Sequence, residues 1–160
     1  MIPIILQCYN RLSYTMQTIS SIKNNILYPN KIIVVDNFST DGTREYLQFC
    51  KEKGIIDYLI LNNKNEGIAI PKNQALEVVK ELAKTEDIRY VMISDNDIIM
   101  PFVRDSQGKC CLSHIVEMMN NHPEVGMCGV DLDRQNAPDN QAWWWKLRQH
   151  PATNPEFTEI

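Results

Sequence analysis

The sequence predicts an α/β protein in which a mostly parallel β-sheet is flanked by helices on both faces. Short apolar runs alternate with segments of helical periodicity, which is typical of repeated β-α units. One run, residues 32–35, contains four consecutive β-branched residues and indicates a strand buried on both faces of a parallel sheet. Four of the runs end in polar residues, which suits ligand binding because open parallel sheets bind ligands beyond the carboxyl ends of their strands.

The elements follow in a regular order along the chain. Strands are expected over residues 2–9, 31–36, 55–61, 88–94 and 125–130, and helices over 12–22, 41–53, 71–82 and 109–121. Leu12, Met16 and Ile19 lie on one face of the first helix, and Ala75, Val79 and Leu82 lie on one face of the third. Gly54 suits a helix end, and Pro71 suits the first turn of a helix.

The chain length of 160 residues suits a single domain of ordinary size. We expect residues 1–132 to form the core and residues 133–160 to form an irregular segment, since the latter are polar and contain Pro138, Pro151 and Pro155. The net charge of −4 argues against a nucleic-acid partner, which would require clustered Lys and Arg side chains. The five cysteines include no Cys-x-x-Cys pair, so neither a disulfide framework nor a zinc site is predicted.

The first residues lack the basic and long apolar regions of a signal peptide, and no stretch approaches the ~20 apolar residues of a membrane span. The expected location is therefore the cytoplasm, including the inner face of the membrane.

Asp95 and Asp97 follow the expected strand 88–94. Alternate side chains of an extended segment share a face, so both carboxylates are expected to point toward one ion. Such hard oxygen ligands suit Mg²⁺ or Mn²⁺, with substrate phosphates completing the coordination. An isolated Asp-x-Asp is more often a solvated turn, and the metal-site reading depends on the three other polar strand ends.

Asp36 ends the second expected strand, where a carboxylate can accept hydrogen bonds from a base or a ribose hydroxyl. The alternative is an N-terminal helix cap, but Ser39, Thr40 and Asp41 are closer to the next helix. The loop over residues 9–11 contains no glycine, which argues against a dinucleotide fold with a Gly-x-Gly-x-x-Gly turn, and no Walker motif is present.

Four segments together resemble the family 2 glycosyltransferases of the GT-A, Rossmann-like fold. They are the runs IILQCYNR at residues 4–11, IVVDNFSTDGT at 33–43, NEG at 65–67 with Lys72-Asn73, and SDND at 94–97. Order and spacing agree over residues 1 to about 130. Gln7 and Cys8 depart from the Pro-Thr that is common at these positions.

The resemblance implies a nucleotide-diphosphate sugar donor, UDP- or GDP-linked, a divalent metal and transfer with inversion to a saccharide or lipid-linked acceptor in polysaccharide biosynthesis. It implies Asp95 and Asp97 as the metal-site aspartates, with Asp97 preferred as the direct ligand. It assigns the nucleotide site to Tyr9, Asn10, Arg11, Asp36, Asn37, Ser39, Asn65, Gly67, Lys72, Asn73 and Asn96. The family's catalytic base is an acidic residue farther downstream, and the sequence identifies none.

Two alternatives remain open. The chain is either a transferase or a catalytically incomplete nucleotide-sugar-binding module, part of a longer transferase. A receiver-type signalling domain would need acidic residues after the first strand and an aspartate after the third, where Tyr9-Asn10 and Asn62-Asn63 stand instead. Trp143, Trp144 and Trp145 suit either stacking on a sugar acceptor or an apolar contact within the fold or between copies of the chain.

Overall fold

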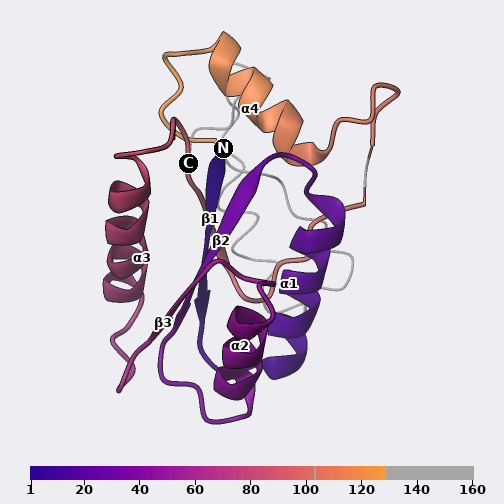
Figure 1. Ribbon diagram of the computed structural model, residues 1–160. Helices are drawn as coiled ribbons and strands as arrows, with labels where there is room; N and C mark the ends of the chain where they lie inside the picture. Colours follow the sequence, from indigo (N-terminus) through magenta and orange to yellow (C-terminus); the bar gives the residue numbers. More distant parts are fainter. Residues whose placement is uncertain (103, 129–160) are drawn as a thin grey trace, which may run out of the picture. The chain divides into compact units, whose positions relative to one another are not determined.

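A computed structural model describes residues 1–102 and 104–128, in which strands and helices alternate (Figure 1). The elements are β1 (Ile2–Cys8), α1 (Leu12–Asn25), β2 (Asn30–Asp36), α2 (Thr43–Glu52), β3 (Tyr58–Leu61), α3 (Ala69–Leu82), β4 (Met92–Asp95) and α4 (Cys111–Asn121). All of them belong to one compact unit, Met1–Val125, and a second unit comprises Gly126–Ile160. The expected irregular segment over residues 133–160, including the three tryptophans, lies outside the described residues.

The four strands form a parallel sheet in the order β3-β2-β1-β4. Their register brings the strand ends together, since Cys8 and Leu61 both pair with Asp36, and Gln7 pairs with Asp95. The residues that follow the strands (9–11, 37–43, 62–67 and 96–97) therefore lie along one side of the sheet, which we call the carboxyl edge. The predicted parallel α/β sheet is confirmed.

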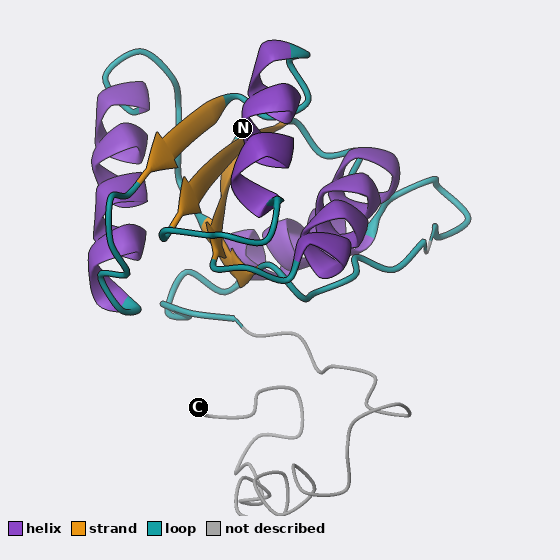
Figure 2. Cartoon of the chain, turned by 90° about the horizontal axis from the view of Figure 1, so that it is seen from below, coloured by secondary structure: helices purple, strands orange, loops and turns teal. Residues whose placement is uncertain are grey.

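Alternate residues of β1 and β2 supply two separate apolar cores. Ile4 and Leu6 face a core that includes Ile19 of α1, Leu47 of α2 and residues of α4. Ile5 and Ile33 face the opposite core with α3, whose Ala75, Val79 and Leu82 are buried there. Helices thus cover both faces of the sheet, with α3 on one side and α1 and α2 on the other (Figures 1 and 2). The buried β-branched run of β2 is the reason that both layers are needed.

Two strands begin later than the sequence predicts. β4 begins at Met92 rather than at residue 88, because Val91 would pair with Pro3, which has no N–H to donate. β3 begins at Tyr58 rather than at residue 55, because the Ile55 N–H is used to close α2 on the Cys50 carbonyl (2.8 Å). Residues 125–128 of the expected fifth strand are not in a strand, and residues 129–130 lie outside the described part of the chain.

Cys8, Cys50, Cys110 and Cys111 are free thiols. None of the helices in the described part of the chain has the length and apolar character needed to cross a bilayer.

Candidate functional site

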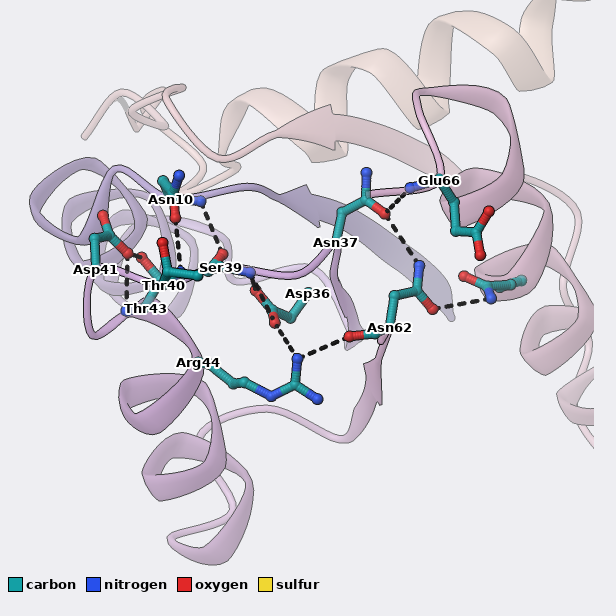
Figure 3. A network of polar contacts seen from close by, with 11 residues as sticks. Asn10, Asp36, Asn37, Ser39, Thr40, Asp41, Thr43, Arg44, Asn62 and Glu66 are labelled. Carbon is teal, nitrogen blue, oxygen red and sulfur yellow. Dashed lines mark hydrogen bonds and ion pairs between the residues drawn. The ribbon is translucent and has the colours of Figure 1, made fainter. Parts of the chain in front are cut away.

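Hydrogen bonds between the first two loops of the carboxyl edge hold the ends of β1 and β2 together. The Asn10 N–H donates to Ser39 Oγ (2.8 Å), and the Thr40 N–H donates to Asn10 Oδ1 (2.8 Å), as Figure 3 shows. Asn10 and Arg11 both have positive φ angles, of 56° and 65°. Asparagine tolerates this left-handed conformation, and its side-chain hydrogen bond helps to fix it. The predicted residues Asn10 and Ser39 are therefore brought into direct contact.

Asp36 lies beneath this loop pair and is fully buried. Its carboxylate accepts hydrogen bonds from the Ser39 N–H (3.3 Å) and from Arg44 Nη1 (3.3 Å), and the same Arg44 nitrogen donates to the Asn62 carbonyl (2.8 Å). A buried charge needs a partner, and the Arg44 guanidinium supplies it. Burial, and next the Asp36 charge, raise the pKa of the neighbouring Cys8 thiol, which is protonated at neutral pH.

Asn37 is the centre of a second network, at 1% exposure (Figure 3). Its Nδ2 donates to Asn65 Oδ1 (2.8 Å) and to the Gly67 carbonyl (2.9 Å). Its Oδ1 accepts from the Glu66 N–H (3.0 Å) and from Asn62 Nδ2 (3.2 Å). Both N–H donors and both oxygen lone pairs of this amide are therefore directed into the loop over residues 62–67, so Asn37 fixes the position of that loop.

The loop over residues 62–67 and the start of α3 form the other side of the candidate site. Gly67 has a φ of 76°, which favours glycine, and its carbonyl also accepts from Gln7 Nε2 (2.9 Å). Lys72 lies on α3 and is half-buried, and the next residue of the helix, Asn73, is exposed. These contacts connect the β3–α3 loop to the end of β1. With the bonds from Asn37, one network joins the ends of β1, β2 and β3.

The acidic pair stands at the end of β4, but not on an extended segment as expected, because the strand ends at Asp95 and the next two residues form a turn. Asp97 Oδ2 accepts from Arg11 Nη1 (2.6 Å), whereas Asp95 Oδ1 lies 3.5 Å from Lys72 Nζ. The two carboxylates therefore have different cationic partners, one from the β1–α1 loop and one from α3. Both are solvent-accessible, with side chains 64% exposed for Asp95 and 37% for Asp97.

Asn96, between them, is buried and points into the molecule. Its Nδ2 donates to the Asn10 carbonyl (2.9 Å) and to Thr15 Oγ1 (2.8 Å). These bonds connect the turn at Asp95–Asp97 to the β1–α1 loop, so the side chain of Asn96 fixes the position of the turn relative to that loop. Tyr9 is 45% exposed at the end of β1.

A model of the family described as glycosyl transferase family 2 matches residues 4–158 of the chain. The chain belongs to glycosyl transferase family 2.

Two curated relatives of this family 2 chain are 30% identical to it. An uncharacterized glycosyltransferase of Rickettsia bellii (strain RML369-C) matches over 96 residues, which is 60% of this chain and 13% of the relative. The putative teichuronic acid biosynthesis glycosyltransferase TuaG of Bacillus subtilis (strain 168) matches over 97 residues, 61% of this chain and 36% of TuaG. The chain thus spans well under half of the length of either relative.

Solved structures show the same fold. Residues 1–349 of S. aureus TarS in complex with UDP-GlcNAc superpose with a TM-score of 0.57 at 19% identity, covering 82% of this chain and 37% of TarS. The mannosyltransferase PcManGT of Pyrobaculum calidifontis in complex with GDP-Man and Mn²⁺ gives a TM-score of 0.51 at 24% identity, covering 62% of this chain and 28% of PcManGT. The GT-A architecture expected from the sequence is confirmed by these likenesses.

The donor set of this family 2 chain can be tested for its fit to a divalent cation. Within residues 1–102 and 104–128, no three carboxylate, imidazole or thiolate groups come together as metal ligands. Asp95 and Asp97 offer accessible carboxylate oxygens, and Mg²⁺ and Mn²⁺ typically use one or two carboxylates together with substrate phosphates and waters. The residues therefore fit a cation that binds together with a phosphate ligand.

Sequence reasoning missed three residues of the polar network. Gln7, Arg44 and Asn62 connect the loops of the carboxyl edge through contacts with Gly67, Asp36 and Asn37. The sequence does contain one indication of the role of Arg44. A buried acid at a strand end, such as Asp36, requires a nearby cation, and Arg44 is the first basic residue after Asp36. Asn62 stood among the polar residues that follow the third strand, but its partners, like those of Gln7, depend on the register of the sheet.

Proposed function

We propose that this chain binds a nucleotide-diphosphate sugar at the carboxyl edge and takes part in the transfer of the sugar, with inversion, to an acceptor hydroxyl. The observation that carries the proposal is the meeting of two accessible acids, Asp95 and Asp97, with two cations, Lys72 and Arg11, at one edge of the sheet. Carboxylates provide for a metal, and the cations provide for phosphate oxygens.

Asp95 and Asp97 would hold Mn²⁺ or Mg²⁺, and this ion would supply positive charge against the diphosphate. The Arg11–Asp97 pair is largely exposed, and exposed ion pairs are worth only ~0.2–1 kcal/mol. Arg11 can therefore leave Asp97 for a phosphate oxygen at little cost. Lys72, at 3.5 Å from Asp95, is placed to do the same from α3.

The nucleoside would lie over the ends of β1 and β2. Tyr9, Asn10 and Arg11 would line one side of it, and Asn65, Gly67 and Asn73 would line the other. The buried residues Asp36, Asn37, Ser39 and Asn96 would act mainly by positioning these loops, since their side chains already have partners within the chain.

In the transfer itself, the acceptor oxygen forms a bond to the anomeric carbon while the bond from that carbon to the diphosphate oxygen breaks. The acceptor proton passes to a carboxylate base, and the nucleoside diphosphate leaves with the bonding electron pair. Arg11 and Lys72 would stabilise the negative charge that grows on the diphosphate.

The relatives support this proposal by their ligands and names. TarS was crystallised with UDP-GlcNAc, PcManGT with GDP-Man and Mn²⁺, and TuaG is named for teichuronic acid biosynthesis. We accordingly propose a UDP- or GDP-linked donor and a saccharide or lipid-linked acceptor, used in polysaccharide biosynthesis on the cytoplasmic side. The second candidate is a binding module without turnover, and the match of the chain to 36% of TuaG is the observation that favours it.

Isothermal titration of UDP and GDP, each with Mn²⁺ and with EDTA, tests the donor site. The proposal predicts binding of one nucleotide with Mn²⁺ and a loss of at least tenfold in affinity for Asp97→Asn, equivalent to about 1.4 kcal/mol. Asp87→Asn is the matched control, because Asp87 is an exposed acid before β4 and outside the carboxyl edge. Absence of binding to both nucleotides would refute the proposal. If the chain binds a nucleotide but neither hydrolyses nor transfers the sugar of the corresponding nucleotide-sugar in a separate assay, the binding module is favoured.

A further inference from the structure

Phe38 has a strained backbone and is exposed to solvent. Its φ angle is 76°, in the left-handed region that bulky side chains rarely adopt. Phe38 is 42% exposed, whereas its neighbours Asn37 and Ser39 are 1% and 5% exposed. Hydrogen bonds of these two neighbours hold the backbone on either side of Phe38 and fix its left-handed conformation, and the residue is exposed there. Such strain in a non-glycine residue is commonly found at ligand-binding sites.

The backbone around Phe38 runs beside the end of β1. The Asn37 N–H donates to the Cys8 carbonyl (2.8 Å), and the Asn10 N–H donates to Ser39 Oγ (2.8 Å). Phe38 and Tyr9 each lie between these two bonds, one on either chain segment. The ends of β1 and β2 thus carry a pair of exposed aromatic residues, and Tyr9 is 45% exposed.

The position of this pair relative to the acidic turn indicates which ligand it would contact. In the sheet order, β1 lies between β2 and β4. The end of β2 is therefore two strand spacings, about 10 Å, from the end of β4. With the diphosphate beside Asp95 and Asp97, the base is the part of the nucleotide that reaches the ends of β1 and β2. Aromatic side chains stack on any nucleobase, because every base presents a π-face.

We propose that Phe38 is a further binding residue for the donor nucleobase, stacking on it together with Tyr9. The inference rests on the proposed function, because it requires a nucleotide at the carboxyl edge. It adds a binding residue at a position where phenylalanine, rather than glycine, occupies a positive φ angle.

The variant Phe38→Gly separates a role of Phe38 in nucleotide binding from a role in the stability of the fold. Glycine adopts a φ of 76° without steric cost, so the variant should unfold at a temperature close to that of the wild type. Its affinity for the nucleotide that the wild type binds with Mn²⁺ should fall about tenfold, since one stacking contact is lost. Its affinity for pyrophosphate with Mn²⁺ should stay unchanged, because pyrophosphate carries no base. Phe38→Leu keeps an apolar side chain without the aromatic face and should lose a similar factor.

Phe49→Leu is the matched control, because Phe49 is an exposed phenylalanine on α2, outside the carboxyl edge. The inference is overturned if the wild type binds a nucleotide and either Phe38 variant binds it equally tightly, or if Phe38→Gly weakens pyrophosphate as much as the nucleotide. In those cases the proposed function stands. If the wild type binds neither UDP nor GDP, the proposed function fails and the inference fails with it.

Discussion

Replacement of Asn37 by aspartate tests the role of the buried amide at the carboxyl edge. The change is nearly isosteric but exchanges the donating NH₂ group for a carboxylate oxygen. That oxygen would face Asn65 Oδ1 at 2.8 Å and the Gly67 carbonyl at 2.9 Å, both of which are acceptors. The new charge would also lie next to the fully buried Asp36.

The expected loss of stability follows from these contacts. Two donated hydrogen bonds disappear, at about 1 kcal/mol each, and the buried acceptors that lose them add a desolvation penalty. We expect the free energy of unfolding to fall by about 3 kcal/mol, which for a domain of this size lowers the melting temperature by roughly 10 °C.

Urea and thermal unfolding followed by circular dichroism measure this change. Asn63→Asp is the matched control, since Asn63 undergoes the same chemical change in the same loop but is exposed. We expect the control to lie within about 0.5 kcal/mol of the wild type. Equal unfolding midpoints for Asn37→Asp and the wild type would show that Asn37 does not hold the loop.

Three further predictions concern the carboxyl edge and the starts of helices. Arg11→Gln removes the cation that pairs with Asp97, so the affinity for Mn²⁺ without nucleotide should rise by up to about fivefold, and the affinity for the nucleotide should fall. Both affinities are measured by titration, and unchanged values would contradict the proposal that Arg11 leaves Asp97 for a phosphate oxygen. Asp41→Ala removes the carboxylate that accepts from the N–H groups at the starts of α1 and α2, and should cost about 2 kcal/mol in urea unfolding, with Asp87→Ala as control. Burial raises the pKa of the Cys110 thiol, but hydrogen bonds from Ser113 and nearby backbone N–H groups together outweigh this effect and lower the pKa to about 7. Its lowered pKa contributes stability that is present at pH 8.5 and lost as the pH falls through 7, a difference of at most about 2 kcal/mol that Cys110→Ser should abolish.

Much of the fold could be predicted from apolar patterning. The run over residues 32–35 indicated burial on both faces, and β2 lies between two apolar cores. The polar strand ends indicated one shared edge, because parallel strands point the same way. The starts of β3 and β4 could not be predicted, since they depend on the closure of α2 by Ile55 and on the absence of an N–H at Pro3.

The candidate site was only partly accessible from the sequence. The positions of Asp95 and Asp97 at a strand end were visible, but their pairing with Lys72 and Arg11 was not, since Arg11 and Asp97 are far apart in the chain. Asn37 and Asn96 have the residue type of ligand-binding amides, and a sequence does not indicate whether an amide faces a ligand or another loop. Here both amides bind loops of the carboxyl edge.

Electron paramagnetic resonance of Mn²⁺ tests most directly whether the carboxyl edge binds a metal together with a nucleotide. The signal of free Mn²⁺ is recorded with UDP or GDP alone, and then with increasing amounts of the chain. We predict that the wild type lowers the free Mn²⁺ signal well beyond the effect of the nucleotide, and that Asp97→Asn does not. An equal decrease for both proteins, or none for either, would contradict the account.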